Sequence, residues 1–150
     1  MDSNEEKGKI AMILKTQLTG MRGVYLIAAE LSRLGFIASS TSRSAIGADI
    51  LATDQKCQRT YSIQVKTNAT TFNFWLLNKE AEKIKSPSHF YAFVNLRPNG
   101  EIEYYIVPSS VVVDKAKVEK SKKGSIWYSF SLQNAKKYKD KWSILGPSQK

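Results

Sequence analysis

The sequence predicts a mixed α/β fold, a sandwich built around one sheet. Two amphipathic helical stretches come first, short apolar strands follow, and a short helix separates these from further strands. This order of elements is typical of a sheet covered by helices. The apolar fraction of 42% and the charged fraction of 24% are those of an ordinary folded protein. The 150 residues are therefore expected to form one domain, residues 1–150.

The N-terminal part of the chain is expected to form two helices. Apolar residues recur at helical spacing in residues 4–18 and again in residues 21–34. Gly20 and Gly23 lie near the junction, and glycine weakens a helix interior, so a break is expected there. Gly35 follows the second stretch at the position where a left-handed cap is common.

The rest of the chain contains short runs of β-branched and aromatic residues bounded by turn-forming residues, the pattern of strands. Strands are expected over 36–38, 50–52, 61–67, 72–77, 89–96, 102–107 and 126–130, and helices over 78–85, 109–117 and 131–139. The aromatic residues Phe72, Phe74, Trp75 and Trp127 are expected to be buried in the sheet. A surface on which bases stack is the alternative.

Charge is the strongest signal in the composition. Lysine and arginine number 23 against 13 aspartates and glutamates, which gives a net charge of +10. Nine lysines and only two acidic residues lie between Lys115 and Lys141. Such an excess favours a polyanionic partner, most often nucleic acid. An anionic membrane surface, an acidic protein and a merely solvated face are the alternatives.

Two further features bear on the cellular environment. The single cysteine, Cys57, excludes an internal disulfide and any cysteine-cluster metal site. No apolar run approaches the ~18 residues that a membrane helix needs, and the acidic, polar N-terminus differs from a secretory signal. A soluble, cytoplasmic protein without a membrane partner is expected.

A candidate site follows from two short motifs, GAD at 47–49 and QVK at 64–66. Residues two apart on a strand share a face, so Gln64 and Lys66 point to the same side. A turn midway between the motifs would place Asp49 opposite Gln64 in an antiparallel hairpin. A carboxylate, an amide and a lysine would then meet at one end of this hairpin.

These groups suit a hard cation such as Mg²⁺, which takes oxygen ligands and keeps several waters. Asp49 supplies a carboxylate, Gln64 a side-chain carbonyl, and Val65 an exposed main-chain carbonyl. Lys66 would lie beside a metal-bound water and stabilise hydroxide or a developing negative charge. Together they provide what metal-assisted phosphodiester hydrolysis requires. The alternative is a half-exposed strand in which Gln and Lys merely alternate with Ile and Val.

From residue 20 to residue 68 the order of these parts resembles the PD-(D/E)XK nuclease superfamily. The segments GVYLIAAELSRLGF, SRSAIGADILA and SIQVKTN are similar to its Holliday-junction-resolvase branch and to a set of short bacterial proteins of undefined role. The match covers about a third of the chain. The resemblance implies a restriction-endonuclease-like, three-layer α/β/α sandwich with a central mixed sheet. It also implies a deoxyribonuclease that uses Mg²⁺, with Mn²⁺ as an alternative.

The resemblance also implies roles for individual residues. Asp49 would be the main metal ligand, Gln64 the second ligand and Lys66 the catalytic lysine. Glu30 is the candidate for the carboxylate that relatives carry on an early helix. Many relatives have an acidic residue where this chain has Val24, and the commoner residue at Gln64 is Glu. Both differences weaken metal binding, because each removes a negative ligand.

Polar residues on either side of these motifs are candidates for contact with nucleic acid. They are Ser42, Arg43, Ser44, Thr67 and Asn68. Arginine suits phosphate because its guanidinium makes paired, charge-assisted hydrogen bonds. A solvated loop and an ordinary strand end are the alternative interpretation.

Three functions are consistent with the sequence. The first is a metal-dependent DNA endonuclease, and the second is a binding module for nucleic acid or protein that keeps the fold without the chemistry. The third is a subunit of a larger defence or mobile-element complex, in which a partner protein supplies specificity. Resolvase-like relatives are dimers, so the resemblance also implies a homodimer.

Overall fold

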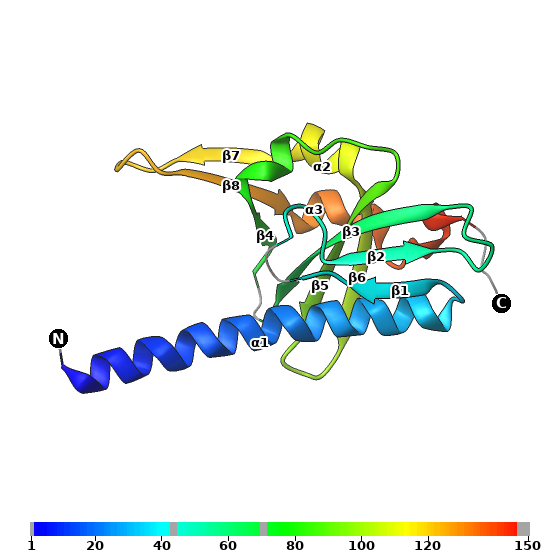
Figure 1. Ribbon diagram of the computed structural model, residues 1–150. Helices are drawn as coiled ribbons and strands as arrows, with labels where there is room; N and C mark the ends of the chain where they lie inside the picture. The colour runs from blue at the N-terminus through cyan, green and yellow to red at the C-terminus, as the bar shows by residue number, and fades with distance from the viewer. Residues whose placement is uncertain (1, 43–44, 70–71, 147–150) are drawn as a thin grey trace.

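The computed structural model describes residues 2–42, 45–69 and 72–146 (Figure 1). The strands are β1 (Ile37–Ser40), β2 (Ile50–Thr53), β3 (Thr60–Asn68), β4 (Phe74–Leu77), β5 (His89–Leu96), β6 (Ile102–Pro108), β7 (Lys117–Lys120) and β8 (Ile126–Ser131). The helices are α1 (Ser3–Arg33), α2 (Ser109–Lys115) and α3 (Leu132–Ala135), with 3-10 turns η1 (Lys79–Glu82), η2 (Lys136–Tyr138) and η3 (Trp142–Leu145). Five strands form a central sheet in the order β1-β2-β3-β5-β6, and three form a smaller sheet in the order β4-β8-β7.

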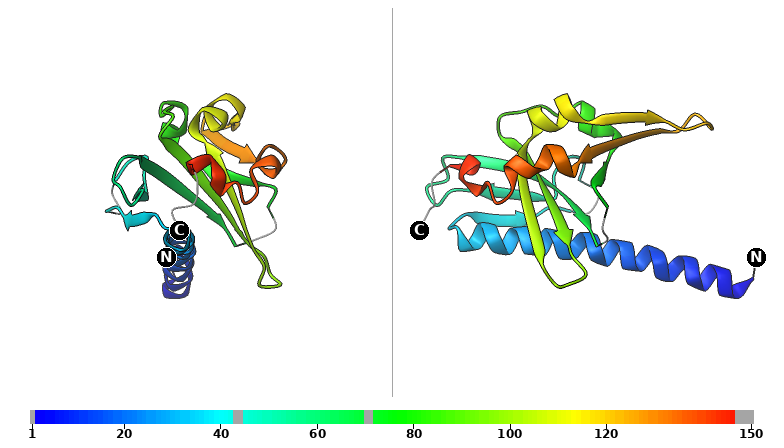
Figure 2. Two further views of the ribbon diagram at one scale, coloured as in Figure 1. Left: turned by 90° about the vertical axis from the view of Figure 1, so that its right-hand side faces the viewer. Right: turned by 180° about the vertical axis from the view of Figure 1, so that it is seen from behind.

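The central sheet is mixed and covered on both faces. β3 and β5 run parallel, whereas the other neighbouring strands run antiparallel. α1 lies along one face, and α2, α3 and the smaller sheet lie on the other (Figures 1 and 2). Every residue of β5 is buried; Ala92 packs with the α1 side of the core and Phe93 with the opposite side. The expected α/β/α sandwich with a central mixed sheet is confirmed.

The expected break in the first helix is wrong. α1 runs through Gly20 and Gly23 for 31 residues without interruption. Gly23 is buried against β3, where a Cβ would collide with the side chain of Thr67. The glycine therefore permits a close approach of helix and strand. The left-handed cap expected at Gly35 is confirmed by its φ of 91°.

β2 and β3 form the expected antiparallel hairpin. Ile50 pairs with Ile63, so Asp49 comes next, against Gln64. The turn is held by the buried carboxylate of Asp54, whose Oδ1 accepts a hydrogen bond from the amide of Gln58 at 2.7 Å. β3 continues past the start of β2 and pairs there with β5. This overhanging part of β3 carries the predicted site residues.

The second half of the chain differs from expectation in three segments. Residues 78–85 form only the 3-10 turn η1 instead of a helix, and residues 131–139 divide into α3 and η2. β7 lies in the lysine-rich stretch, where its solvent-exposed residues show no apolar alternation that would predict a strand. β7 and β8 form a hairpin that projects on the same side as the N-terminal half of α1 (Figures 1 and 2). None of the helices in the described ranges has the length and apolarity of a membrane-crossing helix.

Of the aromatic residues in and next to the smaller sheet, some are buried and others are exposed. Trp75 and Phe130 are buried in the core, as expected for Trp75. Phe72, Phe74 and Trp127 instead expose 54%, 40% and 52% of their surface. The expected burial is wrong for these three. On β4 the side chains alternate, so the strand that buries Trp75 must turn Phe74 outward.

Candidate functional site

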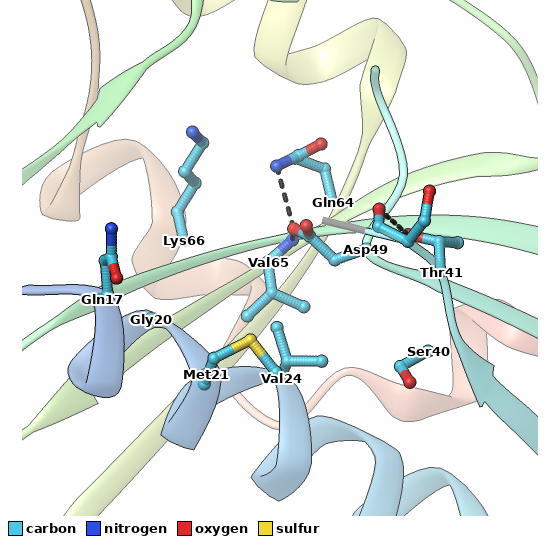
Figure 3. A pocket seen from close by; sticks show the side chains of 11 residues that line it. Gln17, Gly20, Met21, Val24, Ser40, Thr41, Asp49, Gln64, Val65 and Lys66 are labelled. Atoms are coloured by element: carbon cyan, nitrogen blue, oxygen red, sulfur yellow. Dashed lines mark hydrogen bonds between the residues drawn. The ribbon is translucent and has the colours of Figure 1, made fainter. Parts of the chain in front are cut away.

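A pocket of about 280 Å³ lies where β3 extends beyond β2, and α1 forms its opposite wall (Figure 3). Its lining comes from α1, the end of β1 and the segment after it, the residue before β2, and β3. The residues are Gln17, Gly20, Met21, Val24, Ser40, Thr41, Ser42, Asp49, Gln64, Val65 and Lys66. Asp49, Gln64 and Lys66, which the sequence predicts to meet, all line this pocket.

The carboxylate of Asp49 is held by two hydrogen bonds to one oxygen. Oδ2 accepts from Nε2 of Gln64 at 2.9 Å and from the main-chain amide of Val65 at 2.8 Å. The amide of Asp49 itself donates to the carbonyl of Ile63 at 2.8 Å. Hydrogen bonds to a carboxylate are stronger than those between neutral groups. The start of β2 and the acidic side chain are thus fixed together against β3.

Thr41 closes the base of the loop that leads into Asp49. Its amide donates to the carbonyl of Asp49 at 2.9 Å, and its hydroxyl donates to the carbonyl of Ala48 at 2.6 Å. Gly47, within this loop, has a left-handed φ of 84°, which glycine adopts without strain. Thr41 therefore positions Asp49. A threonine in a serine-rich loop carries no sequence pattern that would predict this role.

Lys66 lines the pocket without bonding to Asp49. Its Nζ donates to Oδ1 of Asn78 at 3.0 Å, and Figure 3 shows the ammonium standing apart from the carboxylate. Burial lowers the pKa of Lys66 below its ordinary value of 10.5, because the charged ammonium loses solvation, while the negative charge of Asp49 opposes this shift. Lys66 therefore releases its proton more readily than a solvated lysine. The contact with Asn78 is not predictable from the sequence, because it joins β3 to the segment after β4.

α1 brings no carboxylate to the described lining of the pocket. Val24, where the resemblance implies an acidic residue, does line it. Glu30 lies six residues further along α1, outside the lining, and forms an ion pair with Arg33 at 2.8 Å. The structure does not bring Glu30 together with Asp49, because the helix carries it past the pocket.

The expected nucleic-acid contacts before Asp49 are only partly described. Ser42 lines the pocket. Arg43 and Ser44 lie outside the described residues.

The two expected contacts after Lys66 have other neighbours. The hydroxyl oxygen of Thr67 is buried beneath Gly23 of α1. Asn68 donates from Nδ2 to the carbonyl of Phe74 at 2.6 Å, which ties the end of β3 to the start of β4. Neither residue lies on the wall of the Asp49 pocket. Both line a neighbouring hollow of about 490 Å³, and their contact with nucleic acid stays a prediction.

The oxygen donors at the pocket fit one hard cation. The amide of Val65 points to Asp49. The amide and the carbonyl of one strand residue point to the same side, so the Val65 carbonyl also points to this side of β3, beyond the start of β2. Gln64 presents its amide nitrogen to Asp49. To bind the same cation as Asp49, the side-chain amide must rotate so that its carbonyl oxygen faces the ion, and the torsion angle of this rotation is soft. No group of three His, Cys, Asp or Glu side chains gathers in the described ranges. One carboxylate and two carbonyl oxygens would leave most of the coordination positions of such an ion to water, as Mg²⁺ permits.

No protein-family model matches the chain, and no curated protein matches it. Among solved structures, the chain is similar to the bacterial homing endonuclease I-Ssp6803I, with a TM-score of 0.57 and 15% identity over 87% of this chain and 90% of that one. It is also similar to Hjc, a Holliday junction resolvase from the archaeal hyperthermophile Archaeoglobus fulgidus, with a TM-score of 0.49 and 16% identity over 78% of this chain and 87% of that one. At these identities the likeness shows the fold. The mixed α/β architecture of this chain is that of the homing endonuclease.

Proposed function

We propose that the protein is a metal-dependent endonuclease that hydrolyses phosphodiester bonds of DNA at the Asp49 pocket. The observation that carries this proposal is the convergence of a fixed carboxylate, an amide and a partly desolvated lysine in one pocket. The fold shared with a homing endonuclease supports it. The net charge of +10 supports it as well, because positive charge attracts the phosphate backbone regardless of sequence.

Four residues of the pocket take part in the proposed reaction, three as metal ligands and one as a catalytic lysine. Asp49 and Gln64 would hold Mg²⁺ or Mn²⁺, with the carbonyl of Val65 as a further ligand. A cation bound there would lower the pKa of water and neutralise phosphate charge. Lys66, held at the wall by Asn78, would stabilise the negative charge that develops on the phosphate. Its lowered pKa also suits it to exchange a proton with the attacking water.

A second candidate is a module that binds nucleic acid without cutting it. The observation that favours it is the charge of the pocket: α1 contributes Val24 rather than a carboxylate, and Gln64 is neutral. A site with one negative ligand holds a divalent cation weakly. This candidate predicts binding that weakens as salt is raised, without metal-dependent cleavage.

Two statements about partners stay predictions: that the chain forms a homodimer, and that a partner protein supplies specificity.

The two candidates are separated by cleavage of supercoiled plasmid and of a four-way junction in Mg²⁺, Mn²⁺ or chelator. We expect cutting that requires the metal and is lost in Lys66→Ala and Asp49→Ala. Lys56→Ala is the matched control, because Lys56 is exposed in the turn at the other end of the same hairpin. Equal cutting by the parent and Lys66→Ala would refute the proposed mechanism. Salt-sensitive binding with no cutting by any form would favour the binding module.

A further inference from the structure

Three hollows on the surface of the protein adjoin one another through the residues that line them. The Asp49 pocket shares Lys66 with a hollow of about 490 Å³. That hollow shares Phe74, Leu76 and Trp127 with a third, of about 500 Å³. The second and third hollows, here called the outer groove, extend from Lys66 across the exposed face of the smaller sheet. Thr16 of α1 lines the near part of the groove, and β7 lines the far part.

The floor of the outer groove is aromatic and apolar. β4 buries Trp75 and Leu77 and turns Phe74 and Leu76 outward, and Trp127 of β8 joins them on the same face. Leu76 exposes 51% of its surface, close to the fraction that Trp127 exposes. A sheet with one covered face ordinarily has a polar outer face. A contiguous apolar patch in its place marks an interaction surface.

Positive charge lies at both ends of this aromatic floor. Lys66 stands at the end nearest Asp49, and Lys115 and Lys117 stand at the far end. Glu119 is the one acidic residue among the described residues that line the outer groove, and it forms an ion pair with Lys117. The polar groups between the rings and the far lysines are neutral serines and asparagines. The outer groove therefore presents exposed aromatic rings between lysines.

Exposed rings between lysines match one class of ligand, an unpaired nucleic-acid strand. Its bases stack on aromatic side chains while its phosphates meet the lysines, and this binding depends little on sequence. The bases of an intact duplex are stacked on one another and do not offer their faces. A second copy of the chain, with the same net charge of +10, would be repelled by the lysines.

We propose that the outer groove binds an unpaired stretch of nucleic acid and leads it to the Asp49 pocket. The substrate would then be DNA with a single-stranded segment next to the phosphate that is cut. The statement about cutting rests on the proposed nuclease function, whereas the statement about binding does not.

The test measures binding of the full chain by fluorescence anisotropy in chelator, so that no metal-dependent cleavage consumes the probe. The probes are an oligothymidylate of about 12 nucleotides, a blunt duplex, and the same duplex with an unpaired tail. Trp127→Leu keeps an apolar side chain but removes the ring, and Trp127→Phe keeps a ring. Ile126→Ala is the matched control, because Ile126 is equally exposed on β8 but adjacent residues of a strand face opposite sides.

We expect Trp127→Leu to bind the oligothymidylate and the tailed duplex about five- to a hundredfold more weakly than the parent. Trp127→Phe should lose less, Ile126→Ala should match the parent, and the blunt duplex should bind all four proteins alike. Equal binding of the unpaired probes by Trp127→Leu and the parent would overturn the proposal. So would a dimer in sedimentation that Trp127→Leu dissociates, because a second copy would then occupy the groove. If the groove does not bind unpaired nucleic acid, cleavage that depends on Lys66 can still occur. If the protein does not cleave DNA, the expected differences in binding between the variants still hold.

Discussion

Gly23 of α1 lies directly over the side chain of Thr67 on β3, with no room for a Cβ between them. The hydroxyl oxygen of Thr67 is buried at this contact, and no described residue offers it a hydrogen bond. Thr67 follows Lys66 in the sequence, so the contact sets how far the helix stands from the part of β3 that carries the site. Close packing here therefore positions both walls of the pocket.

Replacing Gly23 by alanine should destabilise the protein although alanine favours helix. The added methyl group must displace Thr67, and such overpacking lowers the free energy of unfolding by about 1–3 kcal/mol. Gly8→Ala is the control, because Gly8 lies on the same helix with open space around it. That variant should gain up to about 1 kcal/mol from helix propensity. Urea unfolding measures the free energy of unfolding of both variants. Equal stability of the two would mean that the contact does not constrain α1.

The fold was predictable where it depends on local pattern. Alternation along residues 61–67 and a turn midway between two motifs are enough to set the β2–β3 register, and Ile50 pairs with Ile63 as that register requires. Whether a glycine ends a helix depends instead on what packs against it, as Gly23 shows. β7 could not be predicted, because an exposed strand of two lysines, one valine and one glutamate has no apolar period.

The pH dependence of stability should report the burial of Tyr91. Burial raises the pKa of Tyr91 to about 12, from an ordinary value of 10.0. As the pH rises from 10, the unfolded chain loses this proton while the folded chain keeps it, so the free energy of unfolding falls. The loss reaches about 2–3 kcal/mol as the pH passes the folded pKa. Below pH 10 the contribution is fully present.

Urea unfolding at a series of alkaline pH values tests this expectation. Tyr91→Phe should remove most of the decline, because phenylalanine has no proton to lose. Tyr25→Phe is the control, since Tyr25 is 64% exposed. A decline of the same steepness in the parent and in Tyr91→Phe would show that other groups cause it.

Asp49 should contribute to folding as well as to cleavage. Asp49→Ala removes the acceptor of the Val65 amide and of the Gln64 side chain, and an unsatisfied buried donor costs about 1–3 kcal/mol. Asp49→Asn keeps an acceptor oxygen and should retain more of the stability. Both variants should lose metal-dependent cleavage. Thermal unfolding alongside the cleavage assay distinguishes the effects, and an Asp49→Ala protein as stable as the parent would contradict the structural role.

The site was predictable to the same extent as the hairpin. Asp49, Gln64 and Lys66 lie on one hairpin, so their convergence follows from strand register and alternation. Thr41 bonds to main chain seven residues further on, and Asn78 lies twelve residues after Lys66; both contacts depend on the course of irregular segments, which no strand or helix pattern encodes. The position of Glu30 depends on the length and course of α1, and the continuous helix carries it away from Asp49.

Gln64→Glu should tighten binding of Mg²⁺ and Mn²⁺, because it adds a second negative ligand beside Asp49. Without metal the same change should destabilise the protein, because it replaces a hydrogen bond by two adjacent carboxylates. Added metal should restore stability, since a ligand that binds only the folded state stabilises it. Isothermal titration measures the affinity for Mg²⁺ and Mn²⁺, and thermal unfolding measures the stability of the protein with and without metal. Gln133→Glu, at an exposed position of α3, adds the same charge away from the pocket and should change neither. If Gln64→Glu binds metal no better than the parent, Gln64 is not a ligand and the binding-module hypothesis gains support.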